Sequence, residues 1–136
     1  MINSRSLDDL TPETKQKALK LIDECAKQGI TIKVTSTFRD FEEQDRLYSL
    51  GRTTKNPDGV SKDRPLGKIV TNSKAGQSWH NFKVAFDVVP IVDNKAIWND
   101  TGLFRKIGAI GKKLGLTWGG DFRSFIDLPH FQNNLS

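Results

Sequence analysis

The chain has 136 residues, enough for one domain with a buried core, and 36% of its residues are hydrophobic. No apolar run approaches the ~20 residues that would span a bilayer, and the first residues lack the hydrophobic stretch of a secretory signal. The net charge of +5 indicates an anionic partner or surface, such as nucleic acid, acidic cell wall or lipid headgroups, without choosing among them.

A helix is predicted over about residues 12–27. Thr11 is a good N-cap, Pro12 suits the first helical position, and Gly29 suits the left-handed residue beyond the end. Five residues of this helix form one apolar stripe and are expected to face the core: Ala18, Leu21, Ile22, Cys25 and Ala26. Cys25, the only cysteine, is therefore predicted to be a buried thiol without a disulfide partner.

A half-buried strand is predicted over residues 30–37, where apolar and polar side chains alternate. A second helix is predicted over about residues 41–50. Asp40 and Glu43 stand three apart as a variant of the capping box, and Gly51 ends the helix.

Residues 51–77 lack convincing periodicity, apart from a short strand predicted at residues 69–71. The segment carries two acidic residues and six basic ones, which are Arg52, Lys55, Lys62, Arg64, Lys68 and Lys74. A connection of this length is usually functional or disordered. We therefore predict a mobile basic loop over about residues 52–76, bordering the functional site.

The remaining pattern predicts a buried strand over residues 84–92 and a helix over residues 101–114 that begins after Asp100. Short strands are predicted at residues 116–118 and 130–132. Because strands and helices do not alternate regularly, the predicted fold class is α+β rather than a doubly wound sheet.

The chain has two histidines, and each lies near an aspartate. His80 precedes the predicted strand that carries Asp87, and His130 follows Asp127 by three residues. Zinc favours imidazole nitrogen and carboxylate oxygen, and a catalytic site keeps three protein ligands and one open position. Two histidines and one aspartate meet this count and leave one acid to act as a base. The sequence therefore predicts a zinc centre.

Each of the two acids also has a simpler interpretation. Asp87 lies in a segment that must be buried, where a lone carboxylate is costly unless it is paired or binds a metal. A salt bridge to a basic residue is the alternative for Asp87, and ordinary turn chemistry is the alternative for Asp127. Pro129 keeps this second stretch out of a helix interior.

Ser78-x-His80 with Ala85-x-Asp87, followed by Asp127-x-x-His130, resembles the VanY-type zinc peptidases, which include D-alanyl-D-alanine carboxypeptidases and dipeptidases. The resemblance is closest to the L-alanyl-D-glutamate endopeptidases, found as phage endolysins and bacterial cell-wall hydrolases. Further matching stretches are residues 35–39, 43–44, 47–48, 51–53, 69–72 and 118–122. Together they span about residues 30–132. The implied structure is one compact catalytic domain over residues 1–136, with a small antiparallel sheet, flanking helices and the Hedgehog/DD-peptidase-like fold.

The resemblance implies a role for each motif residue. The implied zinc ligands are His80, Asp87 and His130. Asp127 becomes the general base, and Arg39 stabilises the substrate carbonyl as it turns into an oxyanion. Ser78 and Gln44 are placed near the substrate. Asp121 is left open between a structural and an ion-binding role. Lys83 stands where the family usually has glycine, and residues 56–66 have the character of an insertion.

The implied function is zinc-dependent hydrolysis of the L-alanyl-D-glutamate bond in peptidoglycan stem peptides, which lyses bacteria. The expected partner is the stem peptide, with no nucleic acid, no stable membrane insertion and no separate wall-binding domain, and the chain is expected to be a monomer. Without an export signal, it is expected to stay in the host cytoplasm until a separate permeabilising protein gives it access to the periplasm and wall.

Three other functions are weighed against this one. A D-alanyl-D-alanine carboxypeptidase or dipeptidase would act on the same stem peptides. A non-catalytic zinc module that only binds the wall would lack Asp127 or Arg39, and both are present. A nucleic-acid binder is suggested by charge alone, since the tryptophans are scattered and no helix-turn-helix is apparent.

Overall fold

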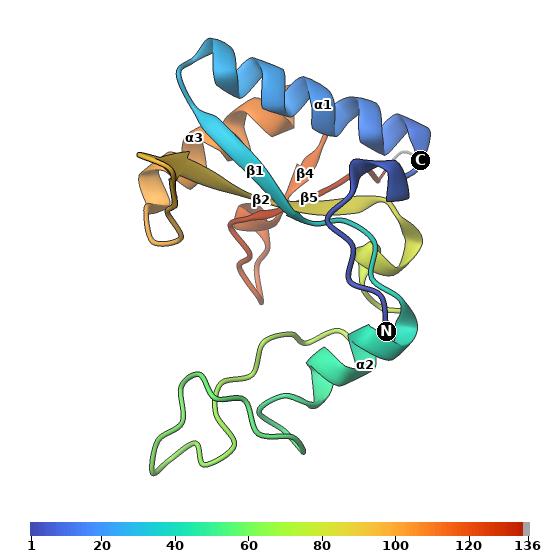
Figure 1. Cartoon of the computed structure of the whole chain (residues 1–136), viewed down its shortest axis with the longest axis vertical. Coiled ribbons are helices and arrows are strands. Elements are labelled where there is room, and N and C mark those ends of the chain that lie inside the picture. The colour runs from blue at the N-terminus through green and yellow to red at the C-terminus, as the bar shows by residue number, and fades with distance from the viewer. Residues whose placement is uncertain (135–136) are drawn as a thin grey trace.

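The structure, a computed structural model, describes residues 1–134 and centres on an antiparallel sheet with the strand order β1-β2-β5-β4 (Figure 1). The strands are β1 (Thr31–Ser36), β2 (Ala85–Val92), β3 (Lys95–Ala96), which pairs with β2, β4 (Thr117–Trp118) and β5 (His130–Gln132). Helices α1 (Pro12–Lys27) and α3 (Thr101–Lys113) cover one face of this sheet. The predicted α+β fold with a small antiparallel sheet and flanking helices is confirmed.

The main core lies between these two helices and the sheet, and α1 contributes most of its predicted stripe. Leu21 and Cys25 are fully buried, and burial raises the pKa of the Cys25 thiol to about 11. Ala26, also predicted to face the core, is exposed. Each helical residue turns the side chain by about 100°, so the residue after Cys25 already points away from the sheet.

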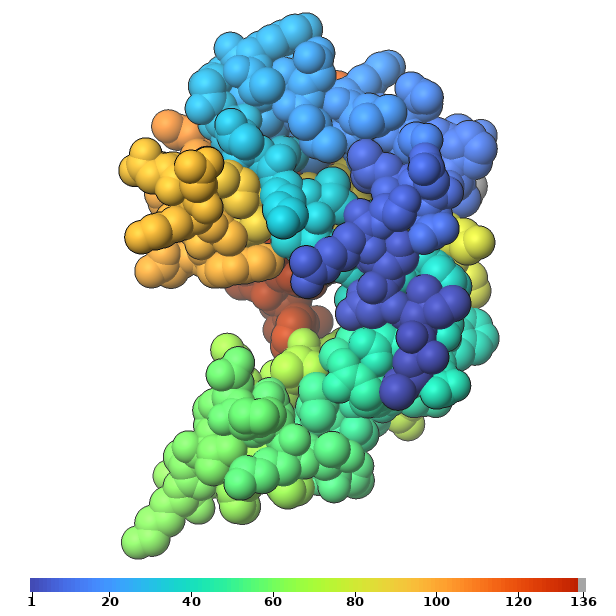
Figure 2. All heavy atoms as spheres, in the orientation of Figure 1, coloured from blue at the N-terminus to red at the C-terminus, as the bar shows by residue number. Residues whose placement is uncertain are grey.

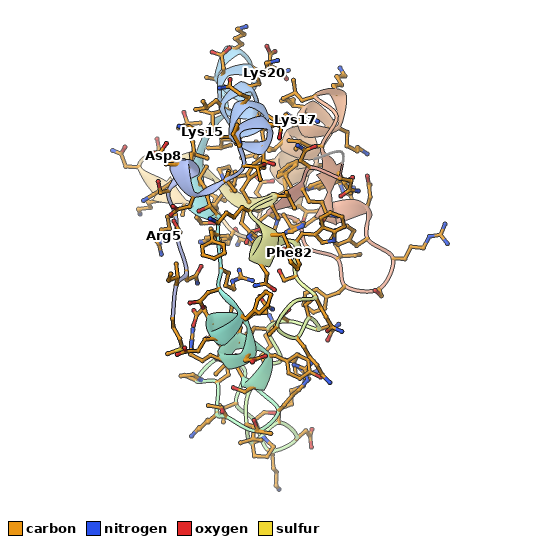
Figure 3. All side chains as sticks on the ribbon, turned by 90° about the vertical axis from the view of Figure 1, so that its right-hand side faces the viewer. Arg5, Asp8, Lys15, Lys17, Lys20 and Phe82 are labelled. Carbon is orange, nitrogen blue, oxygen red and sulfur yellow. The ribbon has the colours of Figure 1, made fainter. Side chains whose placement is uncertain are left out.

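Helix α1 also contacts the N-terminal segment, in which Figure 3 labels Asp8, and the residue that follows β5. Its Lys15 pairs with Asp8 of the short helix η1 (Leu7–Asp9), and its Lys17 donates a hydrogen bond of 3.1 Å to Asn133. Because Asn133 immediately follows β5, these contacts help to hold the strand that carries His130.

Helix α3 approaches the sheet closely because two of its buried residues are glycines. A Cβ at Gly108 would lie 2.4 Å from the ring of Trp118, and a Cβ at Gly111 would lie 2.4 Å from the ring of Phe131. These rings belong to β4 and β5, so the helix backbone itself packs against the strands that lead to the site.

Helix α2 (Phe41–Ser49) lies apart from these layers (Figure 1). As predicted, Asp40 caps it by accepting a hydrogen bond from the Glu43 backbone N–H at 2.8 Å. The Glu43 side chain does not return a capping bond: its carboxylate is paired with Arg46, and the Asp40 N–H donates to Ile2 O at 3.0 Å instead. That pairing lowers the pKa of Glu43.

The segment between α2 and the short helix η2 (Trp79–Phe82) has irregular structure. The strand predicted at residues 69–71 is wrong: these residues pair with no strand, and Ile69 and Val70 are 41% and 38% exposed. The segment folds on itself through backbone carbonyls, with Asn56 donating to Lys68 O at 2.7 Å. Its mobility stays a prediction.

Lys83, which ends η2, adopts the left-handed backbone conformation with φ 64° and ψ 24°. This conformation costs an L-residue about 1–2 kcal/mol, whereas glycine adopts it without strain. The Lys83 ammonium lies 5.0 Å from the centre of the Phe38 ring, a contact that offsets part of this strain.

We expect Lys83→Gly to raise the free energy of unfolding by about 0.5–1 kcal/mol, because relief of strain exceeds the extra entropy that glycine gives the unfolded chain. Thermal unfolding of the metal-free protein would show this as a rise of about 3 °C in Tm. Lys83→Ala is the matched control, since it removes the charge and keeps the Cβ. An equal rise in that variant would assign the gain to charge instead of backbone strain.

Candidate active site

A cleft of about 610 Å³ lies between the segment that follows β4 and the segment that precedes η2. Figure 2 shows the molecule hollowed between these two segments, drawn in red and in green. His80, Asp87 and His130 line the cleft. Phe86, Val88 and Phe131 face the core under α1 and α3, so Asp87 and His130, which alternate with them along β2 and β5, face the opposite side of the sheet. The site therefore lies where the sheet meets the irregular segments.

Three side chains that could hold a metal meet in this cleft. His80 Nε2 lies 3.1 Å from Asp87 Oδ1, and His130 Nδ1 lies 3.3 Å from the same oxygen. One ligand atom from each residue lies within 4.8 Å of the other two. Both histidines are buried, at 3% and 6% exposure. The structure thus brings together the three residues predicted as ligands.

The outer nitrogen of each histidine is held by a carbonyl oxygen. His80 Nδ1 lies 2.8 Å from Thr37 O, and His130 Nε2 lies 2.7 Å from Gln132 Oε1. Since a carbonyl can only accept, these outer nitrogens carry the hydrogen in neutral imidazole, and the inner nitrogens present lone pairs. Lone pairs and a carboxylate that face one point repel each other unless a proton or cation lies between them. This donor set fits a divalent metal ion.

In the absence of a metal, the same closeness shifts the ionisation of these groups. Burial acts to raise the pKa of Asp87, but His80 and His130 outweigh it and hold that pKa well below its ordinary value. Burial acts to lower the pKa of His130, but the hydrogen bond and charge of Asp87 raise it overall. The site therefore favours one or more positive charges beside the Asp87 carboxylate.

Local structure explains how these residues meet. In the antiparallel pairing of β2 with β5, Asp87 lies directly opposite His130. His80 comes from η2, whose first turn is capped by Ser78, with the Ser78 hydroxyl accepting from the His80 N–H at 3.2 Å. The left-handed residue Lys83 then turns the chain into β2. The six residues between His80 and Asp87 thus complete one capped turn and begin strand β2.

Asp127 lines the cleft beside the three possible ligands. Its backbone N–H donates to Gly119 O at 3.0 Å, and its carbonyl accepts from the His130 N–H at 3.2 Å. A Cβ at Gly119 would lie 2.2 Å from the Asp127 carbonyl oxygen, so this close approach requires glycine. Burial and then the charge of Asp87 raise the pKa of Asp127. A partly buried carboxylate of raised pKa suits a general base.

Arg39 also lines the cleft, and Gln44 holds its guanidinium in place. Its Nη1 donates to Gln44 Oε1 at 2.9 Å, and its Nε is buried without a hydrogen-bond partner in the described residues 1–134. Burial lowers the pKa of Arg39, while Asp87 is the largest of the opposing charges. Gln44 itself is fully buried, and its amide N–H donates to Ser73 O at 2.7 Å.

The remaining residues singled out in the sequence differ in whether they line the cleft. Ser78 lines the cleft, whereas Gln44 does not, because both ends of its amide are bonded to Arg39 and Ser73. Asp121 points away and pairs with Lys112 of α3 at 3.0 Å. Arg52, counted in the basic loop, is used internally: it donates to Tyr48 O and Thr71 O at 2.7 and 2.8 Å.

Two further parts of the site escaped the sequence reasoning. Residues 2–4 run beside residues 37–40, with Ser4 N donating to Phe38 O at 2.7 Å, and this places Asn3 in the cleft next to Arg39. Gln132 is the outer partner of His130. The role of Gln132 could have been found in the sequence, since a strand places residue i+2 on the same face as residue i. No signal in the sequence marks the position of Asn3 in the cleft.

Known proteins resemble this chain over most of its length. Residues 71–133 match the family model described as D-alanyl-D-alanine carboxypeptidase. The peptidoglycan L-alanyl-D-glutamate endopeptidase CwlK of Bacillus subtilis (strain 168) is 37% identical over 133 residues, which cover 91% of this chain and 73% of that protein. The L-alanyl-D-glutamate peptidase of Listeria phage A118 is 32% identical, with 96% of this chain covering 41% of the phage protein.

Solved structures show the same fold at lower identity. The Serratia marcescens L-Ala D-Glu endopeptidase ChiX has a TM-score of 0.65 and 18% identity, covering 98% of this chain and 89% of its own. The vancomycin resistance D,D-pentapeptidase VanY, solved in complex with Zn(II), has a TM-score of 0.66 and 14% identity, covering 91% and 72%. The chain belongs to the metallopeptidase family that includes the D-alanyl-D-alanine carboxypeptidases and the L-alanyl-D-glutamate endopeptidase CwlK.

Proposed function

We propose that this protein is a zinc-dependent peptidoglycan endopeptidase that hydrolyses the L-alanyl-D-glutamate bond of the stem peptide. The observation that carries the proposal is the meeting of His80, Asp87 and His130 beside Asp127 and Arg39 in one cleft. The names of the Bacillus and phage relatives support this scissile bond.

Zinc is the metal we assign to the three ligands. Two imidazoles and one carboxylate are a common ligand set of catalytic zinc sites, and the outer hydrogen bonds to Thr37 and Gln132 orient both rings. When bound there, zinc acts as a Lewis acid on the substrate carbonyl and makes water a nucleophile near neutral pH.

The protein groups around the metal supply the proton transfer and the second positive charge. Asp127 accepts the proton of the attacking water and later delivers it to the leaving amine. Arg39, which lines the cleft, donates hydrogen bonds to the carbonyl oxygen as negative charge develops on it.

Two residues predicted near the substrate receive different roles. Ser78 faces the cleft, and its hydroxyl hydrogen remains available to the substrate while its oxygen caps η2. Gln44 does not face the substrate but positions Arg39, since its amide bonds the Arg39 guanidinium on one side and Ser73 O, in the cleft wall, on the other. Asp121, paired with Lys112, has a structural role.

Product analysis of digested peptidoglycan tests the proposal. We expect new amino groups on D-glutamate and free carboxyl groups on L-alanine, with activity lost on chelation and restored by zinc. Mass spectrometry separates this result from the D-alanyl-D-alanine carboxypeptidase alternative, which releases single D-alanine residues. Release of D-alanine alone, or full activity in the presence of the chelator, would contradict the proposal.

The proposal also covers how the enzyme reaches its substrate. Within residues 1–134, no helix has the length and apolar composition to cross a bilayer. We propose that the chain acts as a monomeric endolysin that meets the wall after a separate protein permeabilises the membrane. Expression in the host cytoplasm should then leave cells intact until a membrane-permeabilising agent is added. Lysis on expression alone would contradict this part.

A further inference from the structure

A chain of side-chain hydrogen bonds leads from β4 to the outer nitrogen of His130. Asn134 Nδ2 donates to Thr117 Oγ1 at 2.9 Å, and Gln132 Nε2 donates to Asn134 Oδ1 at 2.9 Å. Gln132 Oε1 then lies 2.7 Å from His130 Nε2. Thr117 and Gln132 also face each other in the pairing of β4 with β5, so both ends of this relay rest on adjacent strands.

The hydrogen bonds of this relay all point the same way. Each amide donates its N–H to the neighbour nearer Thr117 and offers its oxygen to the neighbour nearer His130. With its N–H₂ engaged by Asn134, Gln132 can present only its oxygen to His130. His130 must then carry its hydrogen on Nε2, and the lone pair of Nδ1 faces Asp87 at 3.3 Å. The reversed amide would donate to Nε2 and place the hydrogen on Nδ1, the nitrogen that the metal needs.

The two histidines differ in how this outer bond is made. His80 is held by the backbone carbonyl of Thr37, which is present whatever the side chain. His130 depends on a side chain, and Gln132 is 5% exposed, where a polar amide is costly unless it is bonded. A buried amide at this position is therefore explained by the bonds it makes to His130 and Asn134.

We infer that Gln132 is a positioning residue of the metal centre, which fixes the tautomer and ring orientation of His130 through the relay anchored at Thr117. The inference rests on the proposed zinc site and adds to it a residue that never contacts the metal. Loss of such an outer partner typically costs 10–100-fold in metal affinity.

The test is the zinc dissociation constant of the full chain, measured without substrate by competition with a chromophoric chelator. Gln132→Met, which keeps the length of the side chain and removes the acceptor, should weaken zinc binding about 10–100-fold. Gln132→Glu restores the acceptor and should bind zinc at least as tightly as the wild type. Thr117→Val should show a smaller loss in the same direction, and Thr117→Ser should show none.

Gln77→Met is the control, because Gln77 also lines the cleft, and within residues 1–134 its side chain bonds only the Lys74 backbone on its own loop. It should keep wild-type zinc affinity. The inference is overturned if Gln132→Met binds zinc within about threefold of the wild type, or if Gln132→Glu loses as much as Gln132→Met. A higher KM with unchanged zinc affinity would likewise overturn it, since Gln132 would then be a substrate contact.

The variants also separate this inference from the proposed function. If the wild-type chain binds no zinc, both the proposed function and this inference are contradicted. If it binds zinc but cleaves another peptide bond, the proposed function is contradicted and the inference about Gln132 is not. Should Gln132→Met fail to fold, as judged by circular dichroism, Thr117→Val and Thr117→Ser decide the question with Gln132 intact.

Discussion

Replacement of Asp127 by alanine is expected to lower kcat on peptidoglycan by roughly two to four orders of magnitude, the range typical of general acid–base catalysis. Zinc content and fold should be unchanged, because the hydrogen bonds of Asp127 within residues 1–134, to Gly119 and from His130, use its backbone, and alanine keeps them. Turnover measured with zinc stoichiometry and circular dichroism checks all three expectations.

Asp121→Ala is the matched control for this variant. It removes an aspartate from the same connection between β4 and β5, but Asp121 is exposed and pairs with Lys112 instead of lining the cleft. Near-wild-type turnover is expected for it. If Asp127→Ala turned over substrate as fast as Asp121→Ala, Asp127 could not be the base.

His80→Ala is expected to abolish activity by removing the metal. Loss of an outer partner alone costs 10–100-fold in affinity, so loss of a ligand should exceed a hundredfold. Elemental analysis after dialysis should find zinc in the wild type and essentially none in the variant.

Wild-type protein stripped by a chelator provides the reference for His80→Ala. Zinc should restore activity to the stripped wild type, whose three ligands are intact, and should not restore it to the variant. Full zinc occupancy in His80→Ala would remove His80 from the ligand set.

The chemistry of the site could be predicted from the sequence because it depends on residue types at fixed spacings. A carboxylate inside a strand as apolar as β2 needs a partner, and the chain has only two histidines to serve as ligands. The spacing could not show that Asp87 and His130 pair across adjacent strands, since register depends on contacts between β2 and β5, which are distant in the chain.

Other features depended on the tertiary structure and were predicted only in part. The family resemblance places Gln44 near the substrate, but the Gln44 side chain is fully buried in α2 and bonded to Arg39. The positive φ of Lys83 could not be predicted from the residue type, because lysine rarely adopts this conformation. The apolar run at residues 69–71 suggested a strand, but no edge of the sheet lies beside it to supply hydrogen bonds.

The bare backbone that α3 presents at Gly108 and Gly111 limits how this enzyme can be made more heat-resistant. Exchanging helical glycines for alanine is a common route to stability and gains up to about 1 kcal/mol per position. At these two positions the added methyl group would displace the indole of Trp118 in β4 or the ring of Phe131 in β5, and β5 carries His130. Gly102, where such a methyl meets only Asp100 Oδ1 at 3.6 Å, is the position on this helix open to that exchange.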